Sequence, residues 1–198
     1  MTCLMCAMSD AHQATMENVS AMSIEHLFYH CAQRQPDALR NGVRDNIASL
    51  VIQSKGQPVA QDWPYSRTQP PVDDWSPPSD SYTCYHARWI GMECDFQSIW
   101  STVERGIPVI LGVKLHDALY RCGPSGRLDS SPSSDRPGLH AVLCVACRSD
   151  PEPSICLRNS WGIDWGDHGH AWANADFLTS VSCMAAILEP DGLSIWQS

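Results

Sequence analysis

The sequence lacks the features of a membrane, secreted or nucleic-acid-binding protein. No apolar run approaches the roughly 18 residues that a membrane-spanning helix needs. No basic segment with an apolar stretch follows Met1, so we expect no signal peptide and a cytoplasmic location. Lysine and arginine number 13 against 22 aspartates and glutamates, a formal charge of −9, which argues against nucleic acid or an anionic membrane as a partner. The 198 residues, 43% apolar and 18% charged, suffice for one globular unit with a full core.

Cysteine, in contrast, is abundant, with ten residues. Five disulfides would suit a secreted protein, but several cysteines lie in apolar strands and no export signal is seen, so we expect reduced, buried thiols. Cys3-x-x-Cys6 and Cys144-x-x-Cys147 together mimic a four-thiolate zinc site. Residues 144 and 147 of a regular strand point to opposite faces, whereas zinc needs convergent ligands, so we expect neither metal nor cofactor.

An expected β-hairpin brings a histidine and an asparagine together. Residues 141–147 and 154–158 are apolar, and a turn-like segment joins them. With His140 opposite Trp161 across the hairpin, Asn159 lies on the same face at a diagonal that a side chain can reach. An asparagine oxygen that accepts a hydrogen bond from one imidazole nitrogen sets the tautomer, which leaves the other nitrogen to exchange a proton with a nucleophile.

The segment that begins at Asn159 carries a recognisable motif. It reads Asn-Ser-Trp-Gly-Ile-Asp-Trp-Gly-Asp-His-Gly, and at every fixed position it resembles Asn-Ser-Trp-Gly-x-x-Trp-Gly-x-x-Gly, the motif around the catalytic asparagine of papain-like cysteine peptidases. The family normally continues with tyrosine where this chain has His170. The resemblance implies an α+β, two-lobed papain-like fold with a helical N-terminal lobe and an antiparallel β-rich C-terminal lobe. It also implies a Cys-His-Asn site that contains His140 and Asn159.

The expected nucleophile is Cys3. In this family the cysteine precedes the histidine and asparagine by roughly 130–150 residues, and Cys3 precedes His140 by 137. Cys3 also begins a segment with apolar residues at helical spacing, and the N-terminus of a helix favours the thiolate. Cys6 is the rival, but it would place Asp10 where the family buries a small residue, at the cost of an unpaired buried charge.

Two departures from the family pattern concern the nucleophile. The usual Cys-Gly-Ser-Cys-Trp is absent, with Leu4 in place of tryptophan, and the upstream glutamine that completes the oxyanion hole is missing from these residues. Losing one such donor typically costs about 10²–10³ in turnover. The alternative function is therefore a non-catalytic papain-fold module that binds peptide segments or partners in its cleft.

Other segments support the same resemblance. Asn41 and Gly42 lie where the family carries the Asn-Gly-Gly element that hydrogen-bonds the substrate backbone, with Val43 in place of the last glycine. Trp161 would shield the hydrogen bond between His140 and Asn159 from water. We assign Asn41, Gly42 and Trp161 to substrate binding. The aspartate and histidines that follow could ligate a metal, but the glycine-bounded motif favours a solvated turn; they are Asp167, His168 and His170.

The expected organisation is one peptidase unit over residues 1–198, with a helical lobe over 1–80, a proline-rich linker near 64–80 and a β-rich lobe over 81–198. Capping residues and apolar spacing predict helices from Ser23 to His30, over Asp45 to Ser54 and after Asp95. The helix after Asp95 is followed by a buried strand over 107–113 and then by a variable loop over 121–138.

The expected activity is hydrolysis of peptide bonds in a peptide or protein substrate. The Cys3 thiolate would attack the carbonyl carbon, His140 would take and return the proton, and Asn159 would orient His140. Water would then release the acyl-enzyme. Endopeptidase and exopeptidase activities both remain open, as does the oligomeric state.

Overall fold

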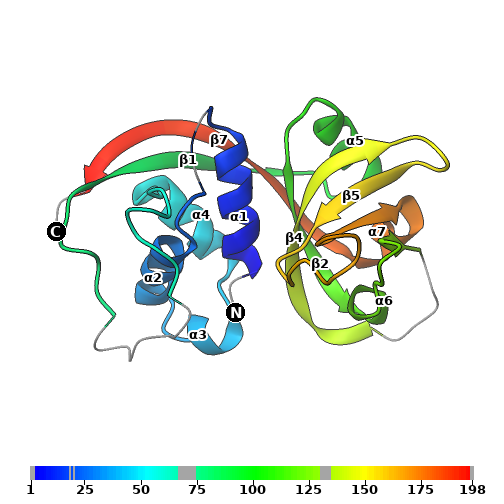
Figure 1. Ribbon diagram of the computed structural model, residues 1–198, viewed down its shortest axis with the longest axis horizontal. Coiled ribbons are helices and arrows are strands. Elements are labelled where there is room, and N and C mark those ends of the chain that lie inside the picture. Colours follow the sequence, from blue (N-terminus) through cyan, green and yellow to red (C-terminus); the bar gives the residue numbers. More distant parts are fainter. Residues whose placement is uncertain (1–2, 18, 20, 67–74, 130–134, 197–198) are drawn as a thin grey trace. The chain divides into compact units, whose positions relative to one another are not determined.

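The computed structural model describes residues 3–17, 19, 21–66, 75–129 and 135–196, which form two compact units (Figure 1). The first unit comprises Met1–Trp89 and Leu188–Ser198, and the second comprises Ile90–Ile187. The sequence-based division at residue 80 differs from these units at two points. The strand after residue 80 continues the first unit, and the chain returns to this unit from residue 188 because the first and last strands are neighbours in one sheet.

The first unit is largely helical. It contains α1 (Cys3–Ala14), α2 (Ile24–Arg34), α3 (Ala38–Asn41) and α4 (Asp45–Ser54), together with most of β1 (Tyr82–Met92) and the end of β7 (Ser182–Trp196). Ser23 caps α2 as predicted, because its side-chain oxygen accepts from the His26 backbone N–H at 3.1 Å. The bounds of α4 are those that the sequence predicts. Fully buried apolar side chains on the three longer helices form the core; they include Met5, Met8, Leu27 and Ile52.

The second unit is built on strands. It contains α5 (Phe96–Glu104), β2 (Val109–His116), α6 (Asp117–Tyr120), β3 (Arg127–Leu128), β4 (Asp135–Arg148), β5 (Ser154–Arg158), β6 (His170–Asn174) and α7 (Ala175–Val181). The strand order is β7-β2-β4-β5-β6-β3, and β1 is the other neighbour of β7. The β2–β4, β2–β7, β4–β5 and β5–β6 pairs are antiparallel, whereas the short β3 pairs parallel with β6.

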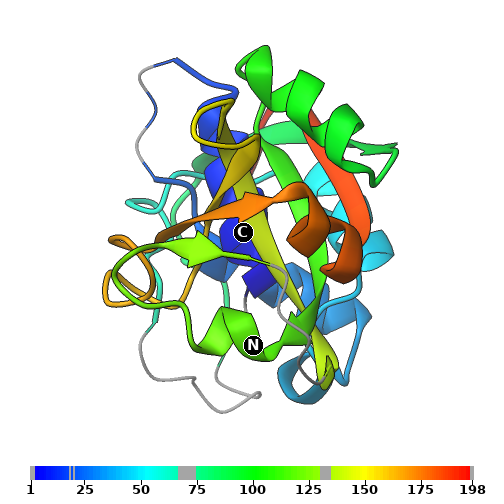
Figure 2. The same ribbon diagram turned by 90° about the vertical axis from the view of Figure 1, so that its right-hand side faces the viewer.

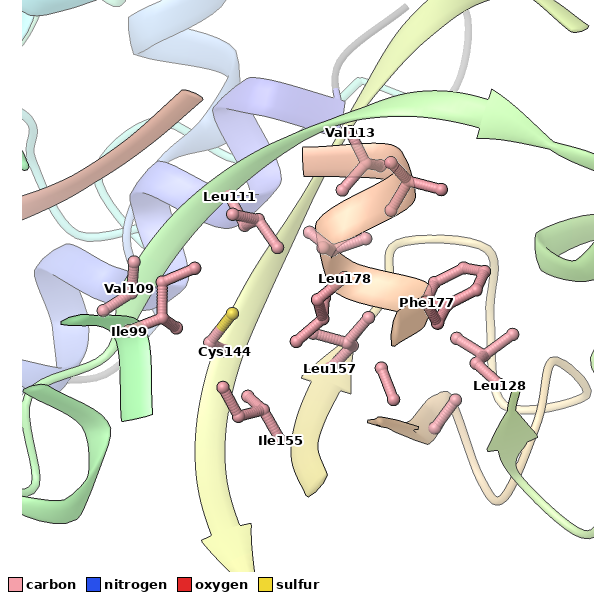
Figure 3. Close-up of a cluster of buried hydrophobic side chains, with 14 of the residues drawn as sticks. Ile99, Val109, Leu111, Val113, Leu128, Cys144, Ile155, Leu157, Phe177 and Leu178 are labelled. Carbon is pink, nitrogen blue, oxygen red and sulfur yellow. The ribbon is translucent and has the colours of Figure 1, made fainter. Parts of the chain in front are cut away.

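Apolar side chains from these strands pack against α5 and α7 in one cluster (Figure 3). Val109, Leu111 and Val113 alternate along β2 and point into this cluster, as the period of two in a strand requires. The helix α7 follows β6 directly (Figure 2) and contributes Phe177 and Leu178. Asp95 caps α5 as predicted by accepting from the Ser98 N–H at 2.9 Å. The mixed helical and antiparallel architecture confirms the predicted α+β fold class.

A β-bulge interrupts the hairpin between β4 and β5. The ladder begins with Leu143 paired to Arg158, so it ends before His140 and Trp161, and the predicted pairing of these two residues is not part of it. The register shifts between Cys144 and Ala146, which leaves Val145 as the extra residue. The bulge also resets the alternation of faces, so Cys144 and Cys147 both pack against the same apolar cluster. The expectation that these two cysteines point to opposite faces is therefore wrong.

The connecting segments differ from the sequence-based expectations. The predicted variable loop over 121–138 is partly strand, because β3 lies within it and β4 begins at Asp135. The proline-rich linker near 64–80 includes residues 67–74, which lie outside the described residues. Trp75 in this linker is buried, and its indole N–H donates to Glu25 Oε1 at 2.9 Å. Among the described helices, none is both long enough and apolar enough to cross a membrane.

Candidate active site

His140 and Asn159 lie together at one end of the β4–β5 hairpin in the second unit. His140 Nε2 is 2.7 Å from Asn159 Oδ1, and both residues are buried, at 6% and 8% exposure. β2 holds the backbone at His140, which pairs with Val113, whereas the ladder between β4 and β5 ends at Leu143. Asn159 follows the last residue of β5, and its backbone N–H donates to the Gly169 carbonyl oxygen at 2.9 Å.

The hydrogen bonds around Asn159 determine which nitrogen of His140 carries a proton. Asn159 Oδ1 also accepts from the Ser160 backbone N–H at 2.8 Å, and a backbone N–H can only donate. The amide oxygen is thus the atom that faces His140, so the imidazole Nε2 must be the protonated, donating nitrogen. Nδ1 of His140 is left as the nitrogen that can take a proton from a nucleophile. The second buried amide atom, Asn159 Nδ2, has no partner among the described residues.

Two tryptophans of the motif lie near His140 and Asn159 and help to fix this part of the chain. The Trp161 ring lies 4.8 Å from the His140 ring at 36°, and Tyr120 stacks on Trp161 at 5.0 Å. Trp165 is buried, and its indole N–H donates to the Leu119 carbonyl oxygen at 2.6 Å. Trp161 therefore covers one face of His140, while Trp165 ties the motif to α6.

The motif glycines allow the tight path of the chain after Asn159. Gly166 has φ +58°, and a Cβ atom there would collide with the His170 carbonyl oxygen. Asp167 and His170 then exchange backbone hydrogen bonds of 2.8 and 3.0 Å around a turn in which His168 has φ +52°. The His168 side chain is 90% exposed and contacts the Asp167 carboxylate at 2.8 Å. Within the described ranges, no group of three histidine, cysteine, aspartate or glutamate side chains is arranged to hold a metal ion.

All ten cysteines are described and are present as free thiols. Burial raises the pKa of Cys31 and Cys84 to about 12 and that of Cys156 to about 11, and it raises the pKa of Cys144 further. Because the thiolate is the reactive form, these four buried side chains are poor candidates for a nucleophile.

The two cysteines considered as nucleophiles lie on α1 in the first unit. Cys3 is the first residue of α1, Cys6 lies one turn later, and both are half-buried. The case against Cys6 is weaker than the sequence suggests, because Asp10 is only half-buried. The position of Cys3 at the start of the helix remains the feature that distinguishes the two thiols.

The predicted substrate-binding pair lies at the end of α3. The side chain of Asn41 is exposed and donates to Asp37 Oδ2 at 3.0 Å. Gly42 has φ +80°, its N–H donates to the Ala38 carbonyl oxygen at 2.9 Å, and its carbonyl oxygen accepts from Gln35 Nε2 at 2.7 Å. The N–H of Gly42 is therefore used within the first unit, a feature that the sequence motif alone did not reveal.

Comparisons with known proteins identify the family and the fold. A sequence model described as "Papain family cysteine protease" matches residues 3–185. The structure is similar to xylellain, a cysteine protease from Xylella fastidiosa, with a TM-score of 0.76, 18% identity, and coverage of 95% of this chain and 79% of that one. It is also similar to procathepsin B S9 from Trypanosoma congolense, with a TM-score of 0.71, 14% identity, and coverage of 96% and 69%.

A third similar structure is the Carica candamarcensis cysteine protease CMS1MS2 in complex with E-64, with a TM-score of 0.65, 18% identity, and coverage of 96% and 88%. No curated protein matches the chain. These likenesses show that the fold is that of the papain-like cysteine proteases. The chain belongs to the papain family of cysteine proteases. Family and fold together support thiol-dependent proteolysis as its general activity.

Proposed function

We propose that the protein hydrolyses peptide bonds through Cys3, His140 and Asn159. The observation that carries this proposal is the 2.7 Å hydrogen bond between His140 and Asn159 inside the family motif. This bond places the imidazole in the tautomer whose Nδ1 can accept a proton from a thiol.

The reaction follows from these roles. The Cys3 thiol transfers its proton to His140 Nδ1, and the thiolate attacks the carbonyl carbon of the scissile peptide bond. The resulting imidazolium returns the proton to the leaving amine, which leaves an acyl group on the Cys3 sulfur. A water molecule then gives a proton to His140 and attacks the thioester, which breaks the bond to the Cys3 sulfur and releases the new carboxylic acid. The imidazolium returns its proton to the sulfur and so restores the thiol. Asn159 orients the ring throughout without itself transferring a proton.

The substrate is a peptide or protein segment, in keeping with the family. We assign Asn41, Gly42 and Trp161 to its binding. Since the Gly42 N–H already donates to Ala38, Gly42 would contact the substrate through its carbonyl oxygen, which has a second lone pair. Trp161 shields the His140–Asn159 hydrogen bond from water on the face that its ring covers.

Labelling with a thiol-directed peptidyl epoxide tests the proposal, since the Carica candamarcensis protease was solved with E-64. We expect one equivalent to attach, and peptide mapping to place it on Cys3. Cys3→Ala should abolish both labelling and cleavage of a fluorogenic peptide, whereas the matched variant Cys6→Ala, which alters the other half-buried thiol of α1, should retain both. Attachment at Cys6 would show that Cys6, and not Cys3, is the nucleophile. A folded wild-type protein that neither labels nor cleaves would instead favour the non-catalytic binding module.

A further inference from the structure

A group of aromatic and histidine side chains in the first unit brings together segments that are far apart in the sequence. We call it the histidine–aromatic cluster, and it consists of His26, His30, Trp63, Tyr82 and Trp196. The two histidines lie one turn apart on α2, with ring centroids 4.5 Å apart, and are 0% and 5% exposed. The proposed peptidase reaction uses none of these residues.

Trp196 attaches the end of β7 to this cluster. Its ring stacks on Tyr82 at 6.1 Å with an interplanar angle of 9°, and it lies 5.2 Å from the His30 ring and 6.3 Å from the His26 ring. Lys55 Nζ lies 5.3 Å from the centre of the same indole. The last residues of β7 are otherwise largely exposed, with Leu193 at 65% and Ile195 at 58%. Trp196 is the side chain that joins this end of β7 to the histidine–aromatic cluster.

The cluster suits neutral histidines and opposes charged ones. Buried His26 Nδ1 and His30 Nε2 have no hydrogen-bond partner among the described residues, and His26 Nε2 faces the weakly accepting Cys84 sulfur at 3.8 Å. An imidazolium needs acceptors at both ring nitrogens, so protonation would bury an N–H without an acceptor together with a positive charge. The surrounding ring faces attract a cation, but they offset only part of that cost.

The charged groups that face the cluster also oppose protonation of the two histidines. Burial, followed by the positive charges nearby, lowers the pKa of His26 to about 2 and that of His30 to about 4. For His26 the largest of these charges is that of His30, followed by Lys55 after α4 and His86 on β1. For His30 they are Lys55 and Arg34 on α2.

Nearby acidic groups do not relieve this effect. The Glu25 carboxylate on α2 accepts from the Trp75 indole and the Ser66 N–H. Burial, and then the charges of Cys84, Asp62 and Tyr29, raise the pKa of Tyr82. Asp62 does not contribute to the lowered pKa of His26 or of His30.

We propose that His26 and His30 form an acid-operated latch, which holds residues 188–196 on the first unit while both rings are neutral and releases them when either ring is protonated. The latch does not depend on the role proposed for Cys3. Residues 188–196 have other tethers to the first unit. β7 pairs with β1, Arg88 on β1 contacts Glu189 at 3.0 Å and Asp191 at 3.9 Å, and His86 bridges the Gln53 carbonyl oxygen at 2.8 Å and Ser194 Oγ at 2.7 Å. These contacts lie at the surface, so the acid-sensitive part of the attachment is the buried histidine pair.

The direction of the pH dependence follows from the lowered pKa values. A histidine released to water has a pKa near 6.5. The free-energy difference that favours the closed state is therefore present above pH 6.5, and it is lost as the pH falls toward the lowered pKa values of the buried histidines. At pH 4.5 the ratio of closed to released molecules should fall by about 10² for each histidine, and by about 10⁴ for the pair.

Hydrogen exchange of the full chain, measured from pH 7.5 to 4.5 and expressed as protection factors, tests the latch. In the wild type, protection of residues 188–196 should fall by about 10⁴ between pH 7.5 and 4.5 while α1 and α4 stay protected. His30→Phe keeps a ring but removes one proton site, and it should limit the fall to about 10². The control His168→Gln removes a histidine whose side chain is 90% exposed and should behave as the wild type.

A second variant tests the role of Trp196. Trp196→Ala removes the ring that contacts both histidines and should lower the protection of residues 188–196 already at pH 7.5. Retained protection in this variant would overturn the latch, as would an equal fall in the wild type and His30→Phe. Simultaneous loss of protection across α1, α4 and residues 188–196 would also overturn it, because the event would then be unfolding of the whole unit.

Discussion

Replacing Asn159 by alanine should reduce turnover without unfolding the protein. The Asn159 oxygen accepts from His140 Nε2 and from the Ser160 N–H, so the variant leaves two donors without an acceptor, at about 1–3 kcal/mol each. Removing Asn159 Nδ2, which has no partner among the described residues, recovers part of this cost. We therefore expect a net loss of about 1–3 kcal/mol in the free energy of unfolding, which a folded domain tolerates.

The loss in catalysis should be moderate. When His140 becomes an imidazolium, its hydrogen bond to Asn159 is charge-assisted and is worth about 1.5–3 kcal/mol, or about 10- to 150-fold in kcat/KM. His140→Ala removes the proton transfer itself, which contributes about 10²–10⁴-fold. Asn159→Ala should therefore be the milder of the two variants.

The assay is kcat/KM on a fluorogenic peptide, combined with urea unfolding of each variant. Asn46→Ala, which changes an exposed asparagine on α4, provides the matched control and should leave both quantities unchanged. Equal and total loss of activity from Asn159→Ala and His140→Ala, with unchanged stability, would refute the division into an orienting and a proton-transferring residue.

Three further predictions concern thiols, glycines and acid stability. Limiting iodoacetamide at neutral pH should modify Cys3 first and the four buried thiols last; peptide mapping that finds uniform slow labelling would exclude an activated thiolate. Gly166→Ala should destabilise the protein more than Gly162→Ala in urea unfolding, because both residues have positive φ but only the Gly166 Cβ would collide with a carbonyl; equal costs would contradict this. Burial lowers the pKa of His12, so its contribution to stability is present above pH 6.5 and is lost as the pH falls. His12→Gln should therefore reduce the slope of unfolding free energy against pH below 6.5, and an unchanged slope would show that His12 does not titrate on unfolding.

Local chemistry explains why much of the fold could be predicted. The helix caps at Ser23 and Asp95 and the bounds of α4 depend on residues within a few positions of each other. The motif after Asn159 is equally local, because its glycines and tryptophans direct a single turn of chain. The approach of His140 to Asn159 depends on one hairpin, because its two strands follow each other in the chain and a short turn joins them.

The tertiary structure decided what depends on residues far apart in the chain. The bulge at Val145 and the common face of Cys144 and Cys147 arise where β4 must match its partner strand and the core at once, and no local signal marks that compromise. The return of β7 to the first unit brings Trp196 onto α2, more than 160 residues earlier in the sequence. Neighbouring residues determine short-range hydrogen bonds and turn geometry. Contacts between residues far apart in the chain form only when the packing of the whole unit makes them favourable.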